Sequence, residues 1–400
     1  MTSATRRSFT LLKNHNFFIY GSNALLMPFL PLYLAQGGFS DVQIGLLMAV
    51  GPIVSIVSNP FWGFATDRLQ KVRSIIFVML LGALVASQIM FQIHTFLPLF
   101  AAMLLFYFFQ TGNPPINNTL MLEAVKNSPF HFGTFRLWGS LGFAVTAIVS
   151  SQVIHWIGLD HLGLIYGVMM LIPLVFCLGL PEPKKTMKRA SLKGIGTLFK
   201  NYYFVFFLLL SILVAMPNRM NSTFISLYIH QLGGSETYVG WSWFCSAFGE
   251  VPVFLLLDRY LKLKPKIMVG ALTFVSLLFS IRWLLMGIAQ TPLEIVAIQL
   301  LHSITFGIYL YAGTHLCEAL VSDTYRASGQ AWYAMFWKGL SGILAGLVGG
   351  WIFSWLGPRG MYAIGSAVSL VGTVGFLFMW RQLVKQERPY ASSREAHRGV

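Results

Sequence analysis

Four cationic side chains interrupt stretches of the sequence that are otherwise almost wholly apolar. They are Arg136, Arg219, Arg282 and Lys338. Each lies within a run of residues long enough to cross a membrane. Because a Lys or Arg at the centre of a bilayer costs about 2.5–3.5 kcal/mol on insertion scales, such residues face water or a carboxylate. We therefore expect these four to line a polar pathway through the protein.

Carboxylates within the same runs provide counter-charges. Glu123 and Glu250 are two of them, and Glu318 is a third. Four cations against three carboxylates leave one positive charge, or two if Glu318 lies too near the end of its span. This excess predicts an anionic solute such as an aromatic carboxylate. The alternative for Glu123 and Arg136 is a simple pairing near the ends of their spans.

A histidine in another span has polar neighbours at helical spacing. Thr305 and Tyr309 follow His302 at i+3 and i+7 and share its face. Because histidine titrates near neutral pH, we predict that His302 takes part in proton coupling or contacts the solute. The alternative is a satisfied interior histidine. His315 and Glu318, one turn apart, are a second candidate for a proton relay.

Three further spans carry polar residues on one face. The sets are Tyr20, Asn23 and Met27; Gln110, Asn113 and Asn117; and Asn218, Arg219 and Asn221. We expect Asn23, Asn117 and Arg219 to contact the solute in a central cavity. The alternative is that the sets only form hydrogen bonds between helices. Pro114 and Pro115 bend the second of these spans, and a bend is tolerated only against protein or water.

The composition identifies the elements that position these side chains. Of the 400 residues, 56% are hydrophobic and only 10% are charged, whereas soluble domains carry about 25% charged residues. A membrane crossing needs about 20 apolar residues, and the chain has room for twelve. The sequence predicts an all-α integral membrane protein with spans at 16–36, 42–66, 74–94, 97–121, 133–157, 162–180, 202–229, 238–257, 266–288, 293–319, 328–353 and 359–381.

The basic residues predict the orientation of the spans. All but five of the 28 Lys and Arg residues fall at ends or in loops on the side that holds both termini; the exceptions are Arg359 and the four within spans. Since cytoplasmic loops are rich in Lys and Arg, we expect both termini in the cytoplasm and the protein in the cell membrane.

The same rule explains the net charge of +15 better than nucleic-acid binding does. The three cysteines fit neither a metal site nor a disulfide framework.

The two halves of the chain resemble each other. The first contains Ser40-Asp41-x-x-x-Gly45, then Asp67-Arg68-Leu-Gln-Lys71; the second contains Ser235-Glu236-x-x-x-Gly240, then Asp258-Arg259-Tyr-Leu-Lys262. We predict a six-helix bundle over 1–180, a basic cytoplasmic linker over 181–200, a second six-helix bundle over 201–383, and a cytoplasmic tail over 384–400. Two such pseudo-repeats favour an alternating-access transporter.

The segment after the second span carries a known pattern. Gly63-x-x-x-Asp67-Arg68-x-x-Lys71-x-Arg73 resembles the loop 2–3 signature of the major facilitator superfamily, without its second glycine. Asp67 can accept hydrogen bonds from a helix N-terminus and pair with a basic neighbour, which would latch the two halves in one state. Asp258 and Arg259 are the matching residues of the second half. The alternative, a merely basic cytoplasmic loop, does not explain Asp67.

Within that superfamily the chain resembles the branch of the phenylpropionate permease and the lactose-type proton symporters. The residues that carry this resemblance are Glu123; His131-Phe-Gly-Thr-Phe-Arg136-Leu-Trp-Gly-Ser-Leu-Gly-Phe143; Gly249-Glu250; Arg282-Trp283; Leu301-His302-x-x-Thr305-Phe306; and Trp337-Lys338.

The resemblance implies roles for individual residues. It places Glu123 and Arg136 in a charged pair at the sugar site and gives Glu250 a part in substrate recognition. It assigns the proton-coupling network to two cations and a histidine: Arg282, Lys338 and His302. Two positions depart from the lactose branch, because Phe143 replaces a Trp that stacks on the sugar ring and Thr305 replaces a carboxylate.

Together these features predict a secondary active transporter that imports a small organic solute with a proton, and that acts as a monomer with no cofactor besides the proton. A sugar or glycoside, a nucleoside and an aromatic carboxylate are the candidate solutes. One alternative is a drug–proton antiporter on the same fold. Another is a non-transporting sensor or enzyme, against which stands the lack of a metal triad, nucleophile elbow or Gly-rich phosphate loop in the sequence.

Overall fold

The apolar runs form long helices in the computed structural model, because a backbone within lipid satisfies its hydrogen bonds only in helices or closed barrels. The structure describes residues 3–125, 132–181, 198–261, 264–322 and 325–396, and every regular element in these ranges is helical. This confirms the predicted all-α membrane fold. The linker predicted at 181–200 falls mostly outside the described residues.

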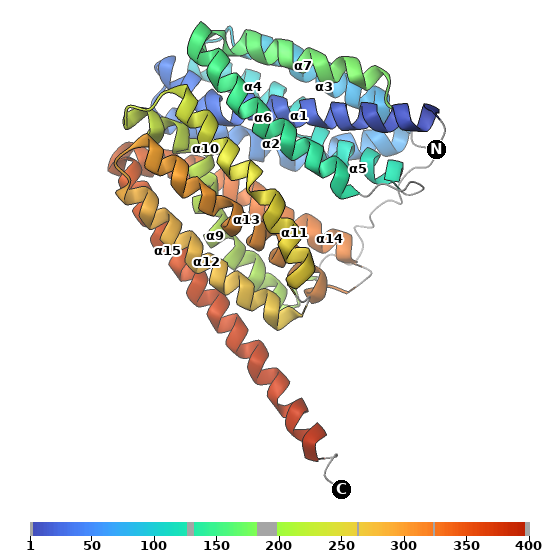
Figure 1. The fold of residues 1–400 in the computed structure, drawn as a ribbon, viewed down its shortest axis with the longest axis vertical. Coiled ribbons are helices and arrows are strands. Elements are labelled where there is room, and N and C mark those ends of the chain that lie inside the picture. Colours follow the sequence, from blue (N-terminus) through green and yellow to red (C-terminus); the bar gives the residue numbers. More distant parts are fainter. Residues whose placement is uncertain (1–2, 126–131, 182–197, 262–263, 323–324, 397–400) are drawn as a thin grey trace.

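The first half of the chain contains seven α-helices and one short 3₁₀-helix among the described residues. They are α1 (Ser3–Gln36), α2 (Asp41–Leu69), α3 (Val72–Met90), α4 (Phe96–Gln110), α5 (Asn113–Val125), α6 (Phe132–Ile157), η1 (Leu159–His161) and α7 (Leu162–Leu178). α1 packs along α6 and α7, and α3 packs along α4 and α7. This group is blue to green in Figure 1.

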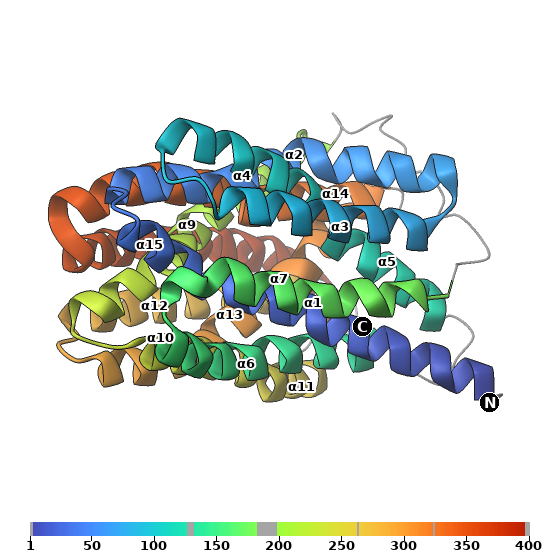
Figure 2. The same ribbon diagram turned by 90° about the horizontal axis from the view of Figure 1, so that it is seen from above.

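The second half is built in the same way. Its helices are α9 (Tyr202–Gln231), α10 (Glu236–Phe248), α11 (Glu250–Tyr260), α12 (Pro265–Ile288), α13 (Pro292–Leu320), α14 (Arg326–Ala334), η3 (Met335–Leu340, a π-helix) and α15 (Ser341–Ala396). α12 packs against α13 and α15, and α15 also packs against α9. In Figure 1, α12 and α15 lie on the opposite side of the molecule from α3 and α7, and Figure 2 shows the same helices from above.

Breaks within helices explain how these elements relate to the twelve predicted spans. Ten described segments are long and apolar enough to cross a membrane. α10 and α11 are each shorter than that and lie end to end. The segment 328–385 is far longer than one crossing of about 30 Å requires, and it is divided at Gly357, where φ is 66°. The described helices thus supply a segment for each apolar run, although the crossings themselves are inferred from length.

The two groups of helices touch at the helix ends that the basic residues predict to be extracellular, called the outer ends below. α2 meets α15 through glycine, because a Cβ on Gly45 would overlap the carbonyl oxygen of Gly346. α6 meets α10, where a Cβ on Gly240 would overlap the side chain of Ser151. Gln152 Nε2 of α6 also donates to Thr237 Oγ1 of α10 at 3.3 Å. The outer ends are therefore closed against each other.

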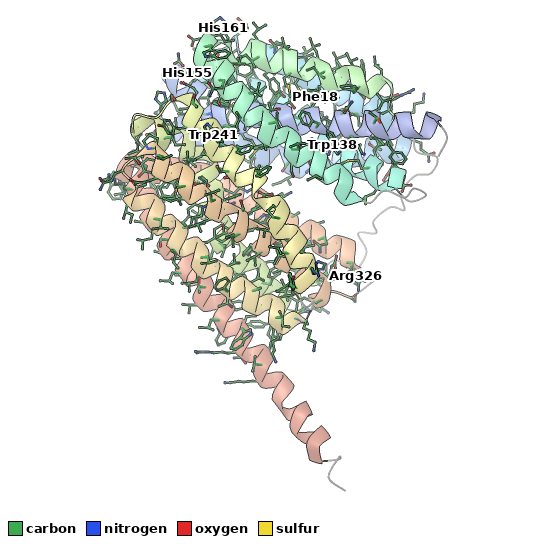
Figure 3. The ribbon with its side chains drawn as sticks, in the orientation of Figure 1. Phe18, Trp138, His155, His161, Trp241 and Arg326 are labelled. Carbon is green, nitrogen blue, oxygen red and sulfur yellow. The ribbon has the colours of Figure 1, made fainter. Side chains whose placement is uncertain are left out.

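The opposite, inner ends of the two groups lie apart. In Figure 1 the ribbons diverge toward the side that holds the N-terminus, and in Figure 3 Arg326 lies at the opposite end of the helices from His155. The side chains of Asp67 and Arg68, at the inner end of α2, form no hydrogen bond or ion pair with the described residues. A Cβ on Gly63 would meet nothing within 4 Å. The predicted latch stays a prediction, and the side chain of Asp258, its counterpart in the second half, lies outside the described residues.

Both ends of α2 are set by their sequence. Ser40 caps the N-terminus: Gln43 N donates to Ser40 Oγ at 3.4 Å, and Ser40 N donates to Gln43 Oε1 at 3.0 Å. Gln70 ends the helix in the left-handed conformation, with φ 53°, and its N–H donates to Thr66 O. This is the position where the superfamily signature has its second glycine. A residue with a side chain pays about 1–2 kcal/mol for this conformation.

We expect Gln70→Gly to raise the apparent melting temperature of the purified protein, because glycine adopts positive φ without steric cost. The gain should be about 1 kcal/mol, less than the full strain because glycine is also more flexible when unfolded. Gln70→Val should lower the melting temperature. An unchanged or lower value for Gln70→Gly would contradict the interpretation that Gln70 is strained.

Candidate functional site

A cavity of about 310 Å³ lies between the two groups of helices. Its walls come from α1, α6, α9, α10, α11, α13 and η3. The residues that line it are Tyr20, Asn23, Met27, Ser140, Phe143, Asn218, Arg219, Asn221, Ser222, Ile225, Ser242, Trp243, Ser246, Ala247, Glu250, Gln299, His302, Phe306 and Lys338. The cavity has the size of a small-molecule site, and both halves contribute to it.

A break between two helices places the carboxylate of this cavity. α10 ends at Phe248, and Glu250 opens α11 after the single residue Gly249. The carbonyl oxygens of Cys245 and Ser246 near the break accept hydrogen bonds from Ser303 Oγ of α13, at 3.3 and 3.1 Å. Irregular backbone at membrane depth survives only with such partners. A Cβ on Gly249 would overlap Ser303 Oγ, which explains the glycine at the break.

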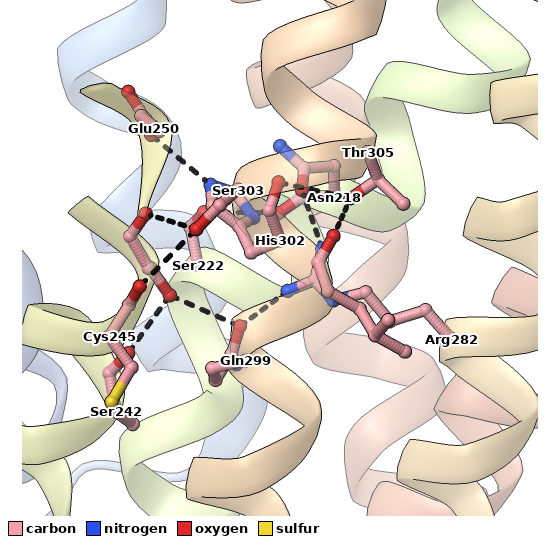
Figure 4. A network of polar contacts seen from close by, with 12 residues as sticks. Asn218, Ser222, Ser242, Cys245, Glu250, Arg282, Gln299, His302, Ser303 and Thr305 are labelled. Atoms are coloured by element: carbon pink, nitrogen blue, oxygen red, sulfur yellow. Dashed lines mark hydrogen bonds and ion pairs between the residues drawn. The ribbon is translucent and has the colours of Figure 1, made fainter. Parts of the chain in front are cut away.

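Glu250 faces the histidine that the sequence singled out. Glu250 Oε1 lies 3.7 Å from His302 Nε2, and the two side chains are only 15% and 14% exposed (Figure 4). Two groups that each gain and lose protons thus meet on the cavity wall. Thr305, one turn further along α13, instead donates to the carbonyl oxygens of Leu301 and His302 at 2.9 and 3.1 Å. Thr305 therefore bonds to its own helix. The carboxylate that lies beside His302 comes from Glu250 of α11 instead.

Arg282 is wholly buried behind this wall. Its Nη2 donates to Gln299 Oε1 at 2.5 Å, and its Nη1 lies 3.5 Å from Asn218 Oδ1 (Figure 4). Its guanidinium carbon lies 4.3 Å from the centre of the Trp283 ring, a cation–π arrangement. Within the described ranges no carboxylate comes within 4.0 Å of this guanidinium. Neutral dipoles and an aromatic face therefore hold the charge.

Two more cations lie on the cavity wall itself. Arg219 comes from α9, one residue after Asn218, and its Nε is buried without a hydrogen-bond partner among the described residues. Lys338 comes from the π-helix η3, and its side chain is exposed at the cavity. π-Helical turns occur often at functional sites because they re-aim a side chain. Both cations belong to the second half of the chain.

The first half contributes aromatic and amide groups instead. Phe143 of α6 packs on Trp243 of α10, with ring centroids 5.8 Å apart, so one aromatic contact joins the two halves at the cavity. Asn23 of α1 accepts a hydrogen bond from Gln110 of α4 at 2.6 Å. The wall is therefore polar and neutral on one side and positively charged on the other.

Other predicted site residues lie away from the lining. Asn117 is buried and donates to Asn16 Oδ1 of α1 at 2.9 Å. Glu318 lies 3.5 Å from His315 near the inner end of α13, and Glu123 lies near the end of α5. Arg136 falls in α6, but its side chain is outside the described residues. The predicted Glu123–Arg136 pair stays a prediction.

Comparisons with known proteins agree with this architecture. A model of the MFS_1-like family, which is part of the major facilitator superfamily, matches residues 9–364. The chain belongs to this family. Among curated relatives it is 27% identical to the "Uncharacterized transporter YwbF" of Bacillus subtilis over 92% of each chain. It is 26% identical to the "Maltose permease" of Geobacillus stearothermophilus over 93% of each, and 24% identical to the "Multidrug resistance protein MdtG" of Escherichia coli over 92% of this chain and 93% of that one.

A solved structure shows the same fold. The nucleoside transporter NupG, as its D323A mutant, superposes with a TM-score of 0.82 at 18% identity, covering 92% of this chain and 99% of that one. This confirms the predicted major facilitator fold. With the family match, it identifies the chain as a multi-pass membrane transporter and not an enzyme.

Several lining residues of this MFS transporter were not predicted, and Gln299 and Trp243 are the two that the site depends on most. Gln299 precedes His302 by three residues on α13, so helical spacing could have placed it on the same face. Trp243 lies in an aromatic stretch, Trp-Ser-Trp-Phe, whose periodicity does not say which ring faces the cavity. Trp241, two residues earlier, is 44% exposed. Only the packing of α10 against its neighbours determines that Trp243, and not Trp241, lines the cavity.

We expect Gln299→Leu to lower the stability of the transporter by about 2–3 kcal/mol, because the buried Arg282 loses its shortest hydrogen bond. Gln299→Glu should keep or raise stability, since it supplies a carboxylate to the same guanidinium. Thermal unfolding of the purified variants measures both. Gln290→Leu, at an exposed position, is the matched control; equal losses at positions 290 and 299 would contradict the role assigned to Gln299.

Proposed function

We propose that this transporter imports a small organic solute together with a proton, by alternating access, in the cell membrane with both termini in the cytoplasm. The observation that carries the proposal is the Glu250–His302 contact on the wall of a cavity between the halves, beside Arg219 and Lys338. Ionisable groups within membrane spans mark solute or proton pathways. The protein acts as a monomer, with the proton as its coupling ion.

The charge of the wall supports a solute rich in hydrogen-bond acceptors. Arg219 and Lys338 face the cavity, while its carboxylate, Glu250, already has a histidine partner. An aromatic carboxylate would place its charge at the cations and its ring toward Phe143 and Trp243. A sugar or glycoside would use the same donors for its hydroxyl groups, and the likeness to a maltose permease supports it. These two solute classes are therefore the first to test.

The proton acts through the pair that Glu250 forms with His302. With one proton between them, the two groups either share it in a hydrogen bond or form an ion pair. Loss of that proton leaves a carboxylate and a neutral histidine, so Glu250 becomes a free acceptor for a cation or for the solute. Such a change of partners alters the relative free energies of the outward-open and inward-open states, which is how proton and solute binding become linked.

A drug–proton antiporter is the second candidate. The likeness to the multidrug resistance protein MdtG favours it. The cations on the cavity wall argue against a cationic drug as cargo. The two functions differ in direction: a proton gradient directed inward drives accumulation by a symporter and extrusion by an antiporter.

Uptake into vesicles that contain the purified protein tests the proposal. The probes are radiolabelled maltose and radiolabelled phenylpropionate, each with and without an inward proton gradient. Accumulation that disappears when an ionophore collapses the gradient is the expected result. Uptake that is the same after collapse would contradict proton coupling, and extrusion driven by the gradient would favour the antiporter.

We expect Glu250→Gln to abolish gradient-driven accumulation, because glutamine offers no carboxylate to exchange a proton with His302. Exchange of labelled for unlabelled solute at equal concentrations should continue, since it needs no net proton movement. Glu318→Gln is the matched control, because Glu318 pairs with a histidine too but lies off the cavity. If Glu318→Gln uncouples transport and Glu250→Gln does not, the His315–Glu318 pair carries the proton instead.

A further inference from the structure

Two histidines share one carboxylate at the closed outer ends. His155 Nδ1, in the last turn of α6, lies 3.4 Å from Glu236 Oε2, in the first turn of α10. His230 Nε2, in the last turn of α9, lies 3.7 Å from Glu236 Oε1. The histidine side chains are 52% and 56% exposed, while Glu236 is 20% exposed. Water and its protons therefore reach both rings.

The cluster crosses the boundary between the two halves. α6 belongs to the first half, and α9 and α10 belong to the second. The contact sits one turn from two other contacts of the same boundary, the Gln152–Thr237 hydrogen bond and the close approach of Gly240 to Ser151. Separation of the outer ends would break the His155–Glu236 contact, whereas His230 and Glu236 would move together.

We propose that His155, Glu236 and His230 form a proton-binding site that latches the outer ends of the two halves. A neutral His155 offers Glu236 only a hydrogen bond; a protonated one offers a charge-assisted bond that exists only while the outer ends are closed. Parting of the outer ends removes this charge-assisted bond, so we expect acid outside to favour closure. The site lies at the surface, apart from the cavity and the Glu250–His302 pair.

The other charged groups at this end do not replace any of the three partners. Asp160, in the turn after α6, accepts a hydrogen bond from Gln36 at 3.0 Å. Glu294, at the start of α13, accepts one from the backbone N of Gln290 at 2.9 Å. Further groups at this end are Asp41 of α2, His94 after α3, His161 beside Asp160, and Arg359 of α15, which interacts with Tyr228. Glu236 is thus the carboxylate that faces His155.

His155 determines the sign of the response, because it alone of the two histidines bridges the halves. Protonation of His155 strengthens the latch. Protonation of His230 holds Glu236 within its own half and does not join the halves. We therefore expect the pH response to disappear with His155 and to survive the loss of His230. This inference rests on the proposed alternating access, since it needs outer ends that open.

The test measures the distance between the outer ends in the full-length purified protein. Spin labels are attached at Trp156→Cys on α6 and Leu293→Cys on α13, both highly exposed, after Cys177, Cys245 and Cys317 are replaced by alanine. Pulsed electron resonance then gives the populations of closed and open outer ends at pH 8 and pH 5.5. We expect the closed-to-open ratio to rise about twofold to fivefold on acidification, the range of one exposed ion pair.

Variants separate the latch from other effects of pH. His155→Gln and Glu236→Gln should lose the response, and His155→Lys should show the same closed-to-open ratio at both pH values because its charge is permanent. His161→Gln is the matched control at the same end of the helices (Figure 3), and it should respond like the parent. These surface substitutions leave the buried core untouched.

Each outcome decides between the latch and the transport cycle. Two populations whose ratio ignores pH, or an unchanged response in His155→Gln, would overturn the latch and leave alternating access standing. A single distance at every pH would overturn both. A response opposite in sign, with opening in acid, would also overturn the latch.

Discussion

An ionised side chain inside a membrane protein must meet a compensating charge or dipole, and the buried guanidinium of Arg282 shows how far that requirement organises the second half of this transporter. Gln299 and Asn218 give it neutral oxygens, and Trp283 gives it an aromatic face. These partners come from three different helices. Because no described carboxylate neutralises the charge, its field reaches the nearby cavity, where His302 and Glu250 meet.

The two halves of the chain contribute different kinds of side chain to the cavity. The first half brings the amide of Asn23 and two aromatic rings, Tyr20 and Phe143, to the cavity, while the second brings the cations, the carboxylate and the histidine. The contact between Phe143 and Trp243 spans the boundary between the two halves at the cavity.

The sequence was informative where one strong free-energy term decides the outcome. Apolar run length predicted the helices. The cost of charge in lipid led us to expect Arg219, Arg282 and Lys338 on a polar pathway; Arg219 and Lys338 line the cavity, whereas Arg282 is buried behind its wall. The direction of a side chain depends on how neighbouring helices pack, and a single sequence contains little information about that packing. Trp243 and Gln299 were missed for that reason, and Asn117 proved to bond another helix. The break at Gly249 also escaped notice, since a lone glycine in a span has many uses.

The contact between α2 and α15 affects how these two helices can move relative to each other. At Gly45 and Gly346 the two backbones touch without intervening side chains. Because glycine has no side chain, the two helices do not interdigitate at this contact. A relative movement of α2 and α15 at this joint, in which they separate and meet again, would therefore require no change of side-chain rotamer at Gly45 or Gly346.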